Sequence, residues 1–271
     1  MALAGMHLAY LRPDRRDHYA ALAAHHSTIG LQKTSEILAN LDEGNCQALY
    51  VSAVLVCLYV FAKGPSPGDY MVFSDNGPSE WFPLLQGVRS IIEMYGHQVL
   101  FTGALSPMVN GPRRAVQPTA VREQKSRIDW EKPFDDLRQF IALSGLRDSA
   151  TYMTALEGLA QCYEGTYGKG PDASYTGDTA NQVVLGWLYR MEQEFIHCLQ
   201  QKHPLALIIL AYFSPLLKSM ETIWFMKGWA EHIITGVHGF IEESYWSWLF
   251  WPVGQLELAA SHTDVVQSTS H

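Results

Sequence analysis

The amino-acid sequence predicts an all-α fold, arranged as a single multi-helix domain. Apolar residues recur at intervals of three and four almost throughout the chain, which is typical of helices, whereas strand-like alternation is nearly absent. Of the 271 residues, 48% are hydrophobic and 17% are charged, so the chain can bury a sizeable core as one large domain or as two fused small ones. We expect one domain over 1–260 and a disordered tail over 261–271.

The first half of the chain is expected to form four helices, over 2–11, 14–40, 43–63 and 79–96. The first ends at Arg12, because the residue before a proline avoids the helical conformation and Pro13 follows. The third ends at 64–68, where the run GPSPG cannot continue a helix. Ser79 is the expected N-cap of the fourth helix, whose apolar residues form one buried face.

The second half begins after a segment over 106–127 that is rich in Pro, Gly, Arg and Gln, which predicts an exposed linker or a mobile lid. A glycine-rich surface loop is expected over 165–177. Pro215 lies inside an apolar helical pattern and predicts a kink. The expected helices cover 130–143, 149–167, 179–202, 203–225 and 227–240, with a short terminal helix around Trp246 and Trp248.

Charge and hydropathy exclude several classes of protein. The formal net charge of -8 leaves no basic stripe to neutralise phosphates, so we expect no direct nucleic-acid binding. The N-terminus is apolar first and basic afterwards, the reverse of a secretory signal, which favours an intracellular protein of the cytoplasm or nucleus. The most apolar runs, 48–62 and 204–217, are shorter than the roughly 18 residues of a membrane span. We interpret them as core helices and expect no membrane span.

The spacing of the cysteines and the absence of catalytic motifs limit the kinds of reaction that we expect. Cys46, Cys57, Cys162 and Cys198 are widely spaced within apolar helical patterns, which favours buried structural thiols in a reducing compartment. The chain contains no HExxH, GxSxG or Walker motif and no strand-anchored GxGxxG, so hydrolases, NTPases and nicotinamide enzymes are excluded. We expect no bound metal and no cofactor.

Several segments of the chain resemble a known family. Near the C-terminus, PLALIILAYF begins at Pro204, GWA covers 228–230, and WSWLFWP begins at Trp246. Near the N-terminus, HLAYLRP begins at His7 and WFPLLQGVRSI begins at Trp81. Together, and in this order, they resemble the ligand-binding domain of fungal zinc-cluster transcription factors of the sterol uptake control type.

The resemblance implies an α-helical domain with a deep internal apolar pocket, which binds a sterol in those regulators. In such factors an N-terminal zinc cluster of six cysteines binds DNA, and this sequence contains neither that cluster nor a basic segment. We therefore expect a version of the domain without its own DNA-binding module. The resemblance also leaves a homodimer open, because such domains often pair through exposed helix faces.

Two functional hypotheses stay open. In the first, the domain is a cofactor-free enzyme of fungal secondary metabolism, a cyclase or Diels-Alder-type pericyclase that acts on a terpenoid or polyketide. Such a site would fold an apolar substrate and exclude water, and orientation of this kind can supply up to about 7–11 kcal/mol. In the second, the domain is a sterol-sensing regulatory protein that acts through a DNA-binding partner. Both require a hydrophobic small-molecule ligand.

Three polar residues near the C-terminus are the candidates for catalysis. His232 follows Trp229 on an aromatic-rich helix and could hydrogen-bond a ligand carbonyl or hydroxyl, although a structural histidine paired within the protein is the commoner outcome. Lys218 and Glu221 lie three residues apart on an apolar helix, which makes an ion pair the simpler interpretation. Inside an apolar cavity, either group would have a shifted pKa and could polarise a substrate carbonyl.

Aromatic residues are concentrated between 224 and 251, where they either close the core or line a pocket. A pocket of about 300–1,000 Å³ lined by such rings would suit a polycyclic ligand. The expected ligand contacts, beside His232, are Tyr59, Trp81, Trp224, Phe225 and Trp229.

Overall fold

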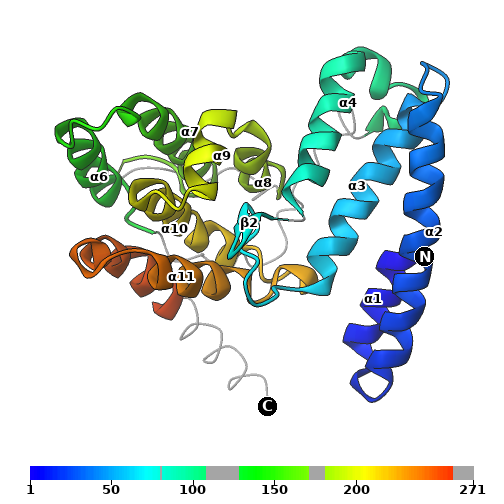
Figure 1. The fold of residues 1–271 in the computed structure, drawn as a ribbon, viewed down its shortest axis with the longest axis horizontal. Coiled ribbons are helices and arrows are strands. Elements are labelled where there is room, and N and C mark those ends of the chain that lie inside the picture. The colour runs from blue at the N-terminus through cyan, green and yellow to red at the C-terminus, as the bar shows by residue number, and fades with distance from the viewer. Residues whose placement is uncertain (80, 108–127, 171–180, 259–271) are drawn as a thin grey trace, which may run out of the picture. The chain divides into compact units, whose positions relative to one another are not determined.

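The structure, a computed structural model, describes residues 1–79, 81–107, 128–170 and 181–258, and its ribbon is drawn in Figure 1. It is 77% helical, which confirms the predicted all-α class. The chain divides into two compact units, Met1–Gly64 with Glu80–Val121 and Pro65–Ser79 with Arg122–His271. We call them unit 1 and unit 2. Most of the expected linker or lid, part of the glycine-rich loop and the C-terminal tail lie outside the described residues.

Among its described residues, unit 1 contains four α-helices, and each lies close to its predicted position. Short 3-10 turns precede α2 and follow α4. The bounds are α1 Ala2–Leu11, η1 Pro13–Arg15, α2 Arg16–Ala39, α3 Cys46–Lys63, α4 Phe82–Leu100 and η2 Gly103–Leu105.

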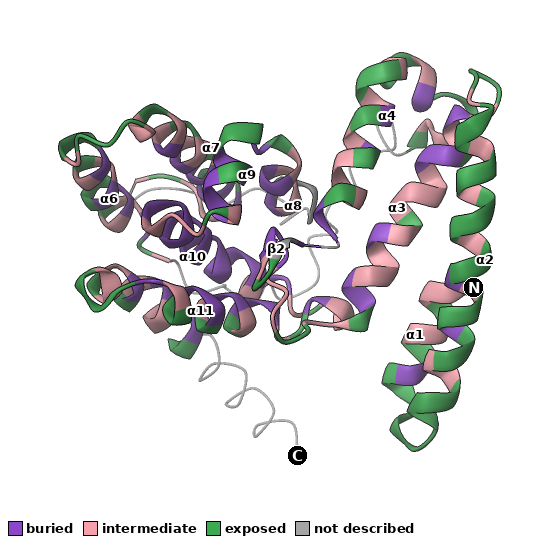
Figure 2. Cartoon of the chain, viewed as in Figure 1, coloured by how far each residue is buried: buried purple, intermediate pink, exposed green. Residues whose placement is uncertain are grey.

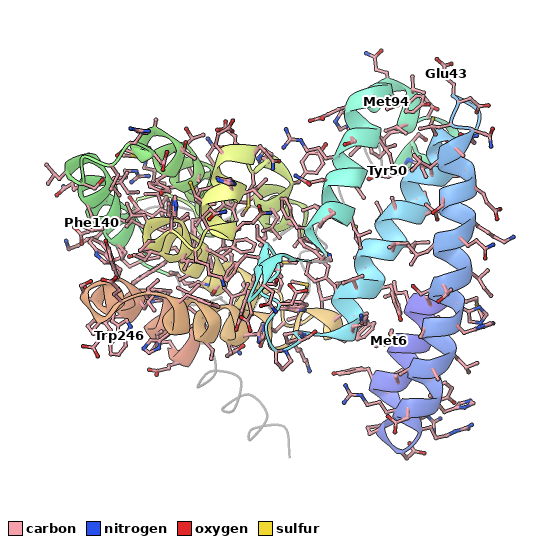
Figure 3. All side chains as sticks on the ribbon, viewed as in Figure 1. Met6, Glu43, Tyr50, Met94, Phe140 and Trp246 are labelled. Atoms are coloured by element: carbon pink, nitrogen blue, oxygen red, sulfur yellow. The ribbon has the colours of Figure 1, made fainter. Side chains whose placement is uncertain are left out.

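The helices of unit 1 pack in sequence order, α1 on α2, both on α3, and α3 on α4. Gly5 allows α1 to approach α2 closely, since a Cβ at this position would lie 2.9 Å from the Cβ of Ala23. Tyr50, labelled in Figure 3, is buried on α3, and its ring meets the edge of Phe101 with centroids 5.3 Å apart. The core of unit 1 contains Cys46, Leu49, Tyr50, Cys57, Val88, Ile91, Leu100 and Phe101.

The start of α4 differs from the prediction. Trp81 is the N-cap residue and Pro83 falls in the first turn, where its missing N–H costs no hydrogen bond. Ser79 does not cap the helix, because its hydroxyl donates a 2.7 Å hydrogen bond to the carbonyl of Met71. The expected end at Gly96 is a break in conformation, with φ 71° and ψ 160°, but helical structure continues to Leu100.

Helix α3 extends beyond both ends of the apolar run 48–62. It has 18 residues with a mean hydropathy of 1.7, and by length and composition it is the one helix of the described chain that could cross a membrane. A third of these residues are buried within the protein, and α3 packs against α1, α2 and α4. Core helices of soluble proteins meet the same criteria, so there is no clear membrane span.

Unit 2 contains a small hairpin and the other helices of the described residues. Its strands are β1 Phe73–Ser74 and β2 Gly77–Pro78, paired antiparallel with Phe73 opposite Pro78. Its helices are α6 Glu131–Leu143, α7 Ser149–Tyr167, α8 Asn181–Arg190, α9 Gln193–Gln200, α10 Pro204–Ser219, η3 Trp224–Met226, α11 Trp229–Phe240 and η4 Glu243–Leu249. A last helical segment covers 250–258.

Helix α10 lies at the centre of unit 2. Every residue from Leu205 to Leu217 is buried, and Figure 2 shows α10 almost entirely in the buried colour. A helix that is apolar on all sides must be enclosed on all sides, and here α7, α9, α11 and η4 pack against it. Pro215 lies inside α10, which continues past it to Ser219.

Two predicted helices are shorter than expected. The helix expected over 179–202 is divided into α8 and α9, because Glu192 adopts an extended conformation (φ -75°, ψ 150°) and begins a new helix. The helix expected over 203–225 ends at Ser219, and the chain then turns through η3. Neither boundary contains a glycine or a proline, so the sequence carried no local signal for these breaks.

Aromatic rings fill the space around α10. Tyr163 on α7 donates its hydroxyl to the carbonyl of Tyr212 at 2.7 Å, which ties the two helices together inside the core. Trp251 packs on Tyr212 with centroids 5.0 Å apart, and its indole N–H donates to the carbonyl of Asp129. Phe140 and Trp246, labelled in Figure 3, belong to α6 and η4. Phe140 stacks on Trp248 at 4.7 Å.

All four cysteines are buried and none forms a disulfide. Burial raises the pKa of Cys57 to about 12, so its thiol is uncharged at neutral pH. The prediction of buried, unpaired thiols is confirmed.

The 65–79 loop is held against α11 by Tyr70. The Tyr70 ring stacks on Phe73 at 5.0 Å and meets the edge of Phe240 at 5.7 Å. It also lies directly over Gly236, where a Cβ would overlap its ring carbons. Glycine at this position is therefore required by the contact between the loop and the helix.

We predict opposite effects for two glycine substitutions on α11. Gly236→Ala should destabilise the protein by about 1–3 kcal/mol, because the added methyl group must displace Tyr70. Gly239→Ala is the matched control: a Cβ there meets nothing within 4 Å, so the gain in helix propensity should stabilise by up to ~1 kcal/mol. Urea unfolding of both variants measures the difference, and equal effects would contradict the packing described here.

Candidate functional site

Lys218 and Glu221, two of the predicted catalytic residues, lie together at the end of α10. The Lys218 ammonium contacts the Glu221 carboxylate at 2.8 Å and the carboxylate of Glu231, on α11, at 2.5 Å. The second Glu221 oxygen accepts a 2.9 Å hydrogen bond from the backbone N–H of Gly228. Because Gly228 is the N-cap residue of α11, Glu221 also places negative charge at the positive end of that helix.

Within this cluster of Lys218, Glu221 and Glu231, the pKa values of Lys218 and Glu231 are shifted in the direction that favours their charged forms. Burial favours the neutral amine of Lys218, but hydrogen bonds and attraction from Glu221 and Glu231 outweigh it and raise the pKa of Lys218 above its usual value. Burial likewise favours protonated Glu231, but Lys218 and a backbone hydrogen bond lower the pKa of Glu231. Lys218 is therefore a protonated ammonium with two acceptors, which suits it to anchor the turn into α11 better than to accept a proton.

His232 contacts the 65–79 loop. Its Nε2 lies 2.8 Å from the carbonyl oxygen of Asp69, and since a carbonyl only accepts, Nε2 carries the proton. The imidazole stacks on Tyr70 with centroids 5.0 Å apart and planes 17° apart. The third catalytic candidate thus has a partner within the protein, and its side chain joins α11 to the loop.

The predicted ligand-contact residues are distributed over both units. Trp229 is buried on α11 beside His232, with ring centroids 6.2 Å apart. Trp224 and Phe225 are half-buried in η3 and meet edge to face at 5.4 Å. Tyr59 and Trp81 belong to unit 1, where Trp81 packs on Phe61 at 4.5 Å.

Of the two interpretations of the aromatic-rich segment 224–251, the contacts of these rings agree with closing of the core. Phe240 packs on Tyr70 and Phe73, and Trp246 stacks on His238 at 4.6 Å. Each of these rings thus packs on at least one neighbouring ring. The pocket predicted from them, and the roles assigned to the eight site residues, stay predictions.

A different part of unit 2 contains a groove of about 420 Å³. It lies between α7, α8 and α9, and none of the eight predicted site residues lines it. Its size falls in the range of small-molecule sites, about 300–1,000 Å³. The lining residues are Thr151, Met153, Thr154, Ala155, Glu157, Gly158, Gln161, Trp187, Arg190, Met191, Glu192 and Phe195.

The floor of the groove is apolar and fixed in position. Trp187, Met191 and Phe195 are buried, and the Trp187 indole N–H donates a 3.0 Å hydrogen bond to the carbonyl of Ala155. The ring lies close to the backbone of α7, since a Cβ at Gly158 would make an ordinary contact of 3.5 Å with Trp187 Cδ1. The indole plane is therefore held against α7 and presents a rigid apolar surface.

Polar groups surround this floor. Glu157 is engaged by the guanidinium of Arg138, with N···O distances of 2.5 and 3.2 Å. Arg190 is exposed and its Nη2 lies 3.7 Å from the sulfur of Cys162. Thr151, Thr154 and Gln161 add hydroxyl and amide groups along α7. Such a site suits an apolar ligand that carries a few polar substituents.

Sequence reasoning missed this groove because it depends on the break between α8 and α9. In one continuous helix, Trp187, Met191 and Phe195 would form a plain stripe at intervals of four. The break at Glu192 gives α9 a new direction, and the space between the three helices follows from it. No residue type in the sequence marks that change.

We predict that replacing Glu231 with Gln lowers stability in a pH-dependent manner. Because the pKa of Glu231 is lowered in the folded protein, its contribution is present above the ordinary pKa of about 4.5 and disappears as the pH falls through the lowered value. Glu231→Gln should therefore cost up to about 1 kcal/mol at neutral pH, a modest effect because the group is half exposed. The difference from the original protein should vanish in acid.

Denaturant unfolding across this pH range provides the measurement. Glu242→Gln is the control, because Glu242 is exposed and takes part in none of the ion pairs described. A loss that persists unchanged in acid would show that Glu231 contributes by packing and not by charge.

Comparison with known proteins gives one distant similarity. The chain is 22% identical over 279 aligned positions to a Zn(2)-C6 fungal-type transcription factor from Gibberella zeae. The alignment covers 93% of this chain and 51% of the relative, so the chain spans about half the length of the protein it matches. No protein-family model and no solved structure matches the chain. The similarity agrees with a fungal transcription-factor-like domain and does not specify the sterol uptake control type.

Proposed function

We propose that this chain is the regulatory domain of an intracellular transcriptional regulator and that it responds to an apolar small molecule. The observation that carries the proposal is the similarity over 93% of the chain to about half of a Zn(2)-C6 fungal-type transcription factor. Similarity along nearly the whole chain, with an all-α fold, favours the regulatory hypothesis over the enzymatic one. The DNA-binding function would belong to another segment or to a partner.

The contacts of the catalytic candidates also favour regulation. Lys218 is paired with two carboxylates, and His232 Nε2 donates to the carbonyl of Asp69. A general acid or base must reach a proton on the substrate, and these groups would first have to leave partners within the protein. Their present contacts connect α10, α11 and the 65–79 loop, which is a structural role.

The groove between α7, α8 and α9 is the proposed ligand site. Trp187, Met191 and Phe195 give it an apolar floor, while Thr151, Thr154 and Gln161 supply hydrogen-bonding groups. A sterol or a terpenoid alcohol has this combination of an apolar body and few polar substituents. All three helices of the groove belong to unit 2, and α7 and α9 contact the central helix α10. Binding there could thus alter the packing of the core.

The regulatory role is tested with a reporter. The chain is fused to an unrelated DNA-binding domain and expressed in yeast with a reporter gene, with ergosterol or farnesol supplied or withheld. We expect reporter output to change by about fivefold or more, the lower end of ordinary allosteric coupling. Unchanged output, together with conversion of a terpenoid or polyketide precursor to an isomer by the purified chain, would favour the cyclase hypothesis instead.

The groove is tested separately by filling it. Thr154→Trp places a large ring in the groove and should weaken binding of a fluorescent sterol by tenfold or more, a loss of about 1.4 kcal/mol. Glu164→Trp is the matched control, because it adds the same side chain to an exposed position of α7 outside the groove. Fluorescence titration gives both dissociation constants. Equal weakening, or none in either variant, would place the ligand elsewhere.

A further inference from the structure

A second cluster of reactive side chains lies in unit 2, apart from the residues considered so far. Cys198 lies in the last turn of α9, His203 is the N-cap residue of α10, and Asp148 is the N-cap residue of α7. The sulfur of Cys198, a ring nitrogen of His203 and a carboxylate oxygen of Asp148 all lie within 4.8 Å of one another. These are three potential metal ligands brought together from three helices.

The turn between α9 and α10 places His203 beside Cys198. The His203 N–H donates to the Cys198 carbonyl and the Lys202 N–H to the Leu199 carbonyl, both at 2.9 Å. This pair of bonds is the Schellman motif, which brings the residue after the helix against the residue near its end. The motif needs a left-handed residue, and Lys202 supplies it with φ 57°.

Contacts of its own side chain hold Lys202 in this rare conformation. The ammonium donates a 2.7 Å hydrogen bond to the carbonyl of Asp75 and lies 4.3 Å from the centroid of the Phe240 ring. A glycine would adopt the left-handed conformation at lower cost. The surroundings of the turn therefore fix the backbone that places Cys198 and His203 side by side.

Asp148 is available for a ligand because its carboxylate does not cap α7. One of its oxygens lies 3.9 Å from His203 Nδ1, longer than a hydrogen bond. Tyr152, one turn along α7, has its hydroxyl 3.0 Å from the same Nδ1. Cys198 is buried at 5% exposure, whereas the side chains of His203 and Asp148 are 40% and 44% exposed. The Cys198 thiol therefore forms the buried floor of the cluster, and the His203 and Asp148 side chains form its accessible edge.

The geometry points to a Zn²⁺ site formed by Cys198 Sγ, His203 Nδ1 and an Asp148 carboxylate oxygen, with the fourth position open to water. In a tetrahedral zinc site with metal–ligand distances near 2.0–2.3 Å, the ligand atoms lie about 3.3–3.8 Å apart. The cluster needs to contract by roughly 1 Å to reach this arrangement. His203 and Asp148 can move, because both are partly exposed.

The ligand set selects zinc among the common divalent ions. A thiolate is a soft ligand that favours zinc over magnesium and calcium, and imidazole and carboxylate complete a typical zinc set. Binding would release one proton to solvent, because Cys198 must lose its thiol hydrogen to form the Zn–S bond. It would also replace the hydrogen bond of Tyr152 at Nδ1, and the His203 proton would then reside on Nε2.

The spacing of these residues explains why the sequence did not predict the site. Cys198 and His203 lie five residues apart, and Asp148 lies 50 residues before Cys198. A single cysteine and a single histidine at that separation match no zinc motif. Only the left-handed turn at Lys202 and the packing of α7 on α9 bring them together.

The experiment uses the purified full chain, stripped of metal with a chelator. Addition of Co²⁺ as a spectroscopic substitute should produce a thiolate-to-cobalt charge-transfer band and the visible bands of a tetrahedral ion. Competition with Zn²⁺ should abolish these bands at one equivalent, and native mass spectrometry should show one zinc per chain. Absence of the charge-transfer band would overturn the proposal.

Variants identify the ligands. Cys198→Ser should remove the charge-transfer band, and Asp148→Asn should weaken Zn²⁺ binding by tenfold or more. Cys162→Ser is the matched control, because Cys162 is also buried in unit 2 and should leave the band unchanged. Circular dichroism confirms that each variant is folded. A band of equal strength in Cys198→Ser would assign the metal to other groups and refute the site, whether or not the chain regulates transcription.

Discussion

The enclosure of α10 is the constraint on which the rest of unit 2 depends. A helix whose residues from Leu205 to Leu217 are all buried cannot fold alone in water, because its apolar surface requires covering on every side. The surrounding elements supply that cover, and the Tyr163 hydroxyl also reaches the Tyr212 carbonyl inside the core. Most of the aromatic-rich C-terminal segment therefore packs in the core. A ligand site has to form between elements whose facing surfaces do not cover α10.

Polar groups near this core illustrate the same constraint. Lys218 and Glu221 lie at the end of α10 and Glu231 lies in the first turn of α11, where a lone charge would be costly, and each is paired with another. The His232 imidazole likewise meets the Asp69 carbonyl. Pairing of this kind stabilises the junction between α10, α11 and the 65–79 loop. It also engages groups that acid–base catalysis would need to present to a substrate.

The sequence predicted those features that depend on local pattern. The end of α1 before Pro13, the termination of α3 at Gly64 and the bounds of α7 follow from residue chemistry, and the structure agrees. The break at Glu192 and the left-handed Lys202 depend on tertiary contacts, and ordinary residues occupy both positions. The availability of the candidate site residues depends on tertiary contacts in the same way. Residues such as His232 were selected for their chemistry, whereas their availability depends on partners such as Asp69 that lie far away in the sequence.

The proposed groove and the proposed zinc site share two helices. Thr151 lines the groove and Tyr152 contacts His203, so adjacent residues of α7 face different sites. On α9, Phe195 lies in the floor of the groove one turn before Cys198. A cation that drew Asp148 toward Cys198 would fix the separation of α7 and α9, and binding of a ligand between these helices would depend on the same separation. Because such coupling is reciprocal in free energy, zinc and ligand would each alter the affinity for the other by the same factor. The break between α8 and α9 and the turn between α9 and α10 would thus give one short helix both of the proposed binding surfaces.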